Sequence, residues 1–147
     1  MAIPARTITF ALAGALILGL SWPLLHPSDT AVHRVVLQRQ FKALKAPAEA
    51  RLIYMDEKPK LGRVFIGAYY HSAMSFEQLQ NHYLPQWKRN GWTAIDEATA
   101  EGSARHLRLC KGDYQAGLEG AGERQNIGWS YAVTFSWNAH QECPPKS

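Results

Sequence analysis

Residues 8–25 form a run of 18 residues without a charged side chain, built mostly from Ala, Leu, Ile and Gly. As an α-helix, such a run is about 27 Å long, close to the thickness of the hydrocarbon core of a bilayer. Arg6 precedes the run, and Trp22 lies near its end, where aromatic side chains often meet the membrane surface. The run therefore predicts a transmembrane helix and places the rest of the chain next to a membrane.

Two other interpretations of this run stay open. A cleaved signal peptide also starts with a positive charge and an apolar stretch, but no Ala-x-Ala cleavage site follows here. The second alternative is a helix buried in the core of the protein. Arg6 favours a cytoplasmic N-terminus, whereas Arg34 and Arg39 favour the reverse, and long domains cross membranes largely regardless of charge. We expect an uncleaved anchor in a bacterial inner membrane, with the domain outside the cytoplasm, on the periplasmic side.

A basic amphipathic helix is predicted over about residues 30–46, ended by Pro47. Its apolar residues recur at helical spacing, and its candidate membrane-surface residues are Arg34, Arg39, Lys42 and Lys45. In one interpretation these four side chains lie on an anionic membrane surface beside the anchor. In the other, the apolar stripe packs on the folded domain and the basic side chains face solvent.

The charge is unevenly distributed along the chain. The formal net charge is +4, with eight Lys/Arg and four Asp/Glu in residues 1–60 but eight of each in residues 61–147. Because the whole excess precedes the main folded region, we do not expect nucleic acid as a partner.

Several segments of the remaining chain predict strands. Residues 63–71 are rich in β-branched and aromatic side chains, and residues 52–55 are a weaker candidate. Extended pieces are also predicted at 92–97, 106–111, 114–119 and 129–137. The last is the clearest, because large side chains alternate with small ones, and we expect the large ones to face a helix. They are Trp129, Tyr131, Val133, Phe135 and Trp137.

One helix is predicted between the strand segments 63–71 and 92–97. Ser75 and Gln78 have the spacing of a capping box at its start, and Asn90-Gly91 ends it. Pro85 predicts a kink or a restart within it. Four residues at helical spacing predict its buried face: Phe76, Leu79, Tyr83 and Trp87.

Together these elements predict an α+β fold: an N-terminal transmembrane helix, then a two-layer sandwich of an antiparallel sheet with one main helix, in the order (β)βαβββ. The expected divisions are residues 1–27 for the membrane anchor or signal segment, 28–47 for the neck helix and 48–147 for the extracytoplasmic domain.

A composite pattern runs through the first half of this domain. It consists of Tyr69-Tyr70, Ser75-x-Glu77, Tyr83 and Gly91-Trp92. The pattern resembles small extracytoplasmic bacterial domains, many of unknown function, in which a strand leads to a Ser-x-Glu-x-Leu helix ending in Gly-Trp. Some modules of the β-barrel-assembly lipoproteins look similar. The resemblance covers about residues 49–137 and implies a fold, with no functional residue carried over.

We expect no enzyme activity, no metal site and no cofactor. None of the six histidines has a partner at His-x-His, His-x-x-x-His or Glu-x-x-His spacing. The glycines at 117, 120 and 122 lack the Gly-Lys-Ser/Thr ending of a phosphate loop, and no Gly-x-Ser-x-Gly motif is present.

Cys110 and Cys143 predict a disulfide. If the last three strands form an antiparallel meander, Cys110 lies at the same edge of the sheet as the end of the last strand. The six residues from Trp137 to Cys143 can reach back across the middle strand. Two unrelated thiols are the alternative, which a cytoplasmic location would favour.

The strand at 63–71 has two faces, one with Phe65, Tyr69 and His71. We expect these three side chains to point outward and to form a partner-contact patch. The predicted function is therefore a membrane-tethered, non-catalytic binding or assembly module of the bacterial envelope, whose partners are the membrane and another envelope protein. Two alternatives are a small envelope enzyme or ligand-binding protein with a pocket between sheet and helix, and a cleaved, secreted effector or inhibitor.

The uncharged run generates a direct prediction. The full-length protein should sediment with membranes and stay there through high-salt and carbonate extraction, because a transmembrane helix is held by apolar burial. Cell fractionation followed by intact-mass analysis measures this. A soluble species that starts near Trp22 or Val32 would contradict the anchor.

Overall fold

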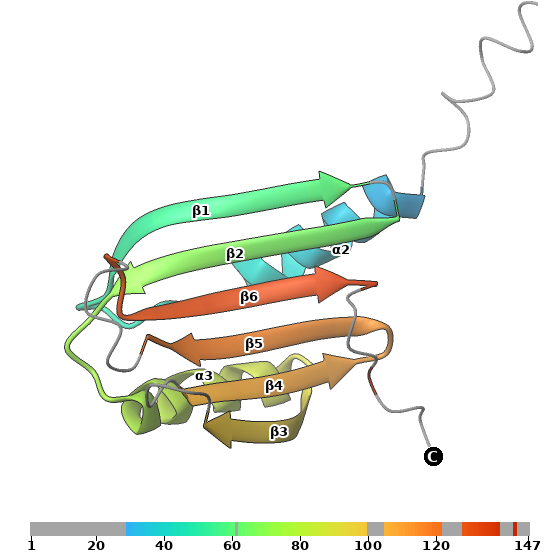
Figure 1. Ribbon diagram of the computed structural model, residues 1–147. Coiled ribbons are helices and arrows are strands. Elements are labelled where there is room, and N and C mark those ends of the chain that lie inside the picture. Colours follow the sequence, from blue (N-terminus) through green and yellow to red (C-terminus); the bar gives the residue numbers. More distant parts are fainter. Residues whose placement is uncertain (1–28, 61, 100–104, 122–127, 139–142, 144–147) are drawn as a thin grey trace, which may run out of the picture.

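The computed structural model describes residues 29–60, 62–99, 105–121, 128–138 and 143 (Figure 1). These residues form a six-stranded sheet with two helices. The elements are α2 (Asp29–Lys42), β1 (Arg51–Lys60), β2 (Arg63–His71), α3 (Phe76–Arg89), β3 (Thr93–Thr99), β4 (Arg105–Lys111), β5 (Tyr114–Gly120) and β6 (Tyr131–Trp137).

The sheet has the strand order β1-β2-β6-β5-β4-β3, and every neighbouring pair is antiparallel. The α+β class with an antiparallel sheet is therefore confirmed, and so is the meander of the last three strands. The formula (β)βαβββ is one strand short, because four strands follow α3. The candidate strand at 52–55 is longer than predicted, since β1 has ten residues.

Both helices lie on the same side of the sheet, behind it in the view of Figure 1. Leu37 of α2 is completely buried, and Phe41 packs edge-on against Phe135 of β6 with ring centroids 6.0 Å apart. The helix predicted as a neck is thus part of the packed layer, and it ends at Lys42 rather than near residue 46.

The core lies between the sheet and these helices. Alternate residues of the strands point into it, as the period of two requires. The residues with at most 3% exposure include Leu37, Val64, Ile66, Leu79, Tyr83, Trp87, Leu107, Leu109, Leu118, Tyr131, Val133 and Phe135. Trp129 departs from the predicted alternation: it precedes β6 and packs edge-on against Tyr69, on the other face of the sheet.

The ends of α3 follow the predicted local signals. The Ser75 hydroxyl accepts from the Gln78 amide, and the Gln78 side chain accepts from the Ser75 amide, which is the complete capping box. At the other end, Asn90 is the cap and Gly91 has a φ of +79°, which glycine adopts without strain. The helix contains Pro85 without interruption, so the restart predicted there does not occur.

No helix within the described ranges is long and apolar enough to span a bilayer. The predicted anchor at residues 8–25 lies outside those ranges.

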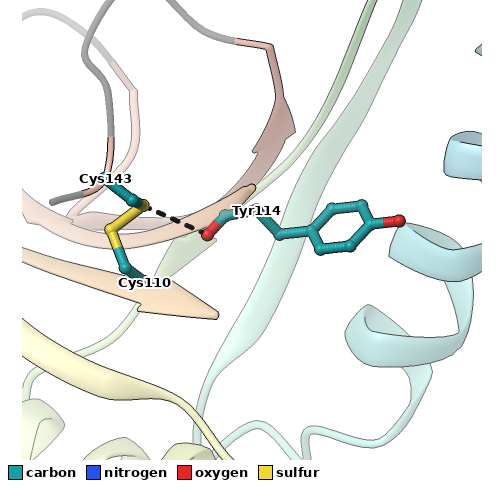
Figure 2. The surroundings of a disulfide bond; sticks show 3 residues. All are labelled: Cys110, Tyr114 and Cys143. Carbon is teal, nitrogen blue, oxygen red and sulfur yellow. Dashed lines mark hydrogen bonds between the residues drawn. A yellow bond between two sulfur atoms is a disulfide. The ribbon is translucent and has the colours of Figure 1, made fainter. Parts of the chain in front are cut away.

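Cys110 and Cys143 form the predicted disulfide, with Cα atoms 5.8 Å apart (Figure 2). Cys143 Sγ also lies 3.4 Å from the carbonyl oxygen of Tyr114, which begins β5. Cys143 therefore lies against β5, the strand between β4 and β6. The Tyr114 side chain points the opposite way in Figure 2, toward α2, and its hydroxyl lies 2.7 Å from His33 Nδ1.

The disulfide predicts a thiol count and a stability change. The denatured, unreduced protein should have no free thiol. Replacing both cysteines by serine should lower the free energy of unfolding by about 3–4 kcal/mol, because the bridge closes a loop with a sequence separation of 33. Thiol titration and urea unfolding measure the two effects. Two reactive thiols in the unreduced protein would contradict the bridge.

Candidate functional site

No helix or strand within the described ranges covers the sheet face opposite the helices, here called the open face (Figure 1). The described residue Cys143 lies against this face at β4 and β5. Phe65, Gly67 and Tyr69 of β2 point to it, because Val64, Ile66 and Ala68 are buried on the helix side. The neighbouring strand β6 contributes only small side chains: Ala132, Thr134 and Ser136. The open face therefore has no large side chain along β6.

Four aromatic side chains lie at one side of this face; we call them the aromatic patch: Tyr54, Phe65, Tyr69 and Trp129. Tyr54 of β1 stacks on Tyr69, with ring centroids 4.2 Å apart and planes at 12°. Trp129 meets Tyr69 edge-on at 5.3 Å. Tyr54 is 45% exposed, a high value for a side chain of this size. Exposed, mutually packed aromatic rings are typical of protein contact surfaces.

Gly67 explains how two of these rings fit on the sheet. A Cβ atom at this position would lie 2.9 Å from Phe65 Cε1 and 3.1 Å from Tyr69 Cε2. Both rings therefore lean over the glycine backbone from either side, and a larger residue would displace them. The glycine lets the patch lie close to the sheet.

Both acidic and basic residues lie near the aromatic patch. Asp56 pairs with Lys58 at 2.5 Å, and both belong to β1. Burial raises the pKa of the Tyr69 hydroxyl above its ordinary value, and the neighbouring Tyr54, Asp56 and Glu119 raise it further. Tyr69 is thus a neutral hydrogen-bonding group at any physiological pH.

The predicted contact residues Phe65 and Tyr69 lie together in this patch. His71 lies at the end of β2, where its Nδ1 is 3.1 Å from Ser130 Oγ. Sequence reasoning missed two members. Trp129 was assigned to the helix side by its alternation, and Tyr54 belongs to a strand whose facing is altered by a bulge between Leu52 and Tyr54.

The four predicted membrane-surface residues are not equivalent. Arg34 binds Glu57 of β1, which also accepts a hydrogen bond from Gln38 at 3.0 Å. Its charge is therefore compensated within the domain. The other three, Arg39, Lys42 and Lys45, are exposed.

β1 is an edge strand with an apolar, exposed first half. Leu52, Ile53 and Met55 are 48%, 39% and 51% exposed. Such an edge invites pairing with another strand, but the bulge at Ile53 shifts the register and Lys58 adds a charge. These features favour side-chain contact over strand addition at this edge.

Among the residues that the structure describes, no three His, Cys, Asp or Glu side chains are grouped so that they could hold a metal ion. Comparison of the chain with protein-family models, with curated proteins and with solved structures found no match.

The geometry at Gly67 generates a prediction. Gly67→Ala should lower the free energy of unfolding by about 1–3 kcal/mol, because Phe65 and Tyr69 have to leave their positions. Gly117→Ala is the matched control on the same face. Its Cβ would meet Thr134 Oγ1 at 2.8 Å and His106 Cε1 at 3.4 Å but no ring of the patch. We therefore expect it to lower the stability without changing the aromatic signal.

Urea unfolding gives the two stabilities, and near-UV circular dichroism reports the aromatic packing. An alanine at position 67 that leaves both the midpoint and the aromatic signal unchanged would show that the rings do not lean on this glycine.

Proposed function

We propose that the protein is a membrane-tethered, non-catalytic binding or assembly module of the bacterial envelope, with its domain outside the cytoplasm. The observation that carries the proposal is the aromatic patch on the open face. Tyr54 is exposed and the other three rings are half-buried. Because they are packed against one another, they have lost much of their conformational freedom, so a partner can cover them at little entropic cost.

The partner that we propose is another envelope protein. The patch combines apolar ring area with the hydroxyls of Tyr54 and Tyr69 and the indole of Trp129. Tyr and Trp are the side chains that dominate protein–protein contacts, because they offer large areas together with a hydrogen-bonding group. The adjoining small residues of β6 leave room for a partner's side chains.

Two features support the location. The uncharged run at residues 8–25 is long enough to anchor the chain in a bilayer. Cys110 and Cys143 form a disulfide. Disulfides persist in oxidising compartments such as the periplasm and are rare in the cytoplasm. The resemblance to small extracytoplasmic bacterial domains agrees with this location.

An enzyme with a pocket between sheet and helices is less well supported. The described residues in that space form the packed core, in which Tyr83, Trp87 and Phe135 are at most 1% exposed. A site there would require these large side chains to move apart.

The test is photo-crosslinking in living cells with a benzoylphenylalanine at position 54. Tyr54 lies in the patch and is 45% exposed, so the probe should form one defined adduct with an envelope protein. The matched control is a probe at Val35, which is 56% exposed on α2, on the helix side of the sheet.

We expect the adduct at position 54 to be lost when Trp129→Ala is added, while the position-35 probe does not form this adduct at all. Trp129 lies outside β6, so its removal alters the patch without cutting into the core. The same adduct from both positions, or an adduct that Trp129→Ala leaves unchanged, would contradict the patch as the contact surface.

A further inference from the structure

A cleft of about 480 Å³ lies on the helix side of the molecule, between the loop after α2 and the last turns of α3. It is separate from the aromatic patch, which lies on the opposite face of the sheet. Its lining residues are Ala43, Lys45, His82, Gln86, Arg89 and Asn90.

The cleft is held together by hydrogen bonds to one residue, Lys45. The side-chain oxygen of Gln86 accepts from the Lys45 amide at 2.9 Å, and its nitrogen donates to the Lys45 carbonyl at 3.1 Å. His82 Nε2 lies 2.7 Å from the same carbonyl. Gln86 Nε2 also lies 3.1 Å from the same ring nitrogen, so the three residues form one cluster. The Lys45 backbone is thereby fixed to α3 across 41 residues of sequence.

The charge of the cleft is positive. Lys45, in the loop after α2, and Arg89, in the last turn of α3, are exposed cations that line it. None of its lining residues, all of which are described, is acidic. The two exposed cations thus face a cleft without a carboxylate to neutralise them.

The end of α3 does not cancel this charge. The C-terminal carbonyls of a helix carry partial negative charge when they are unpaired. Here the Gln86 carbonyl accepts from the Asn90 backbone and side-chain amides, and the Lys88 carbonyl accepts from the Gly91 amide. Lys111 Nζ donates to the Asn90 carbonyl at 2.6 Å. These hydrogen bonds weaken the negative potential that an anion in the cleft meets at this end of α3.

We propose that this cleft binds a phosphate group. The planar guanidinium of Arg89 can donate two parallel hydrogen bonds to phosphate oxygens, and the Lys45 ammonium supplies a second, movable charge. Two cations match the double charge of a phosphate monoester better than the single charge of a carboxylate. The phosphate belongs to a lipid headgroup or to a soluble phosphorylated compound, and the test separates these sources.

The test is an NMR titration of the full-length protein in neutral detergent micelles. The ring signals of His82 and the side-chain amide signals of Gln86 report on the cleft. Inorganic phosphate should shift them saturably, with signals of the aromatic patch unchanged. Arg89→Gln and Lys45→Gln should each weaken binding about tenfold or more, since each removes one of the two cations. Lys88→Gln is the matched control: an exposed cation in the same helical turn that does not line the cleft.

Two further probes distinguish the ligands that carry the phosphate. Tighter binding of dihexanoyl phosphatidic acid than of glycerol 3-phosphate supports a lipid headgroup, and equal binding supports a soluble compound. The proposal is overturned if phosphate produces no saturable shift. It is also overturned if Lys88→Gln weakens binding as much as Arg89→Gln, because the anion would then respond only to the general positive charge of the surface.

Discussion

The packing of both helices on one face of the sheet determines which surfaces of the domain are buried and which stay accessible. Tyr83 and Trp87 of α3 and Leu37 of α2 are buried in one core with Tyr131 and Phe135 of β6. The Tyr83 and Tyr131 hydroxyls lie 3.1 Å apart within it, and burial raises the pKa of Tyr131 to about 12. Since β6 lies inside the sheet, between β2 and β5, its opposite face is left as the floor of the open face. The aromatic patch lies on this face, where no described helix or strand covers it.

The elements that the sequence predicts correctly depend on short-range physics. The capping box at Ser75 and the turn at Gly91 are set by hydrogen bonds and backbone geometry within a few residues. The pairing of β2 with β6 is different, because it joins residues about sixty to seventy positions apart and no local pattern encodes it. The disulfide was predictable because a meander and a six-residue tail restrict Cys143 to the neighbourhood of Cys110.

The candidate sites likewise contain features that local sequence predicts and features that depend on long-range packing. Alternation along β2 places Phe65 and Tyr69 on one face, so half of the aromatic patch follows from the sequence. The sequence does not assign Tyr54 to the patch, because a bulge changes the face that its side chain takes. It places Trp129 on the wrong face, because the alternating pattern continues before the start of β6. The cleft could not be predicted at all: Lys45 and Gln86 meet only after α2 and α3 have packed on the same sheet.

We propose that the partner protein contacts the open face of this domain and not its helix side. Hydroxyl-radical footprinting of the full-length protein, in native membranes and after purification, tests it most directly. We expect Tyr54, Tyr69 and Trp129 to be protected in membranes and oxidised in the purified protein, while the buried Tyr83 and Tyr131 stay protected in both. Equal oxidation of the three patch residues in the two states would contradict the claim.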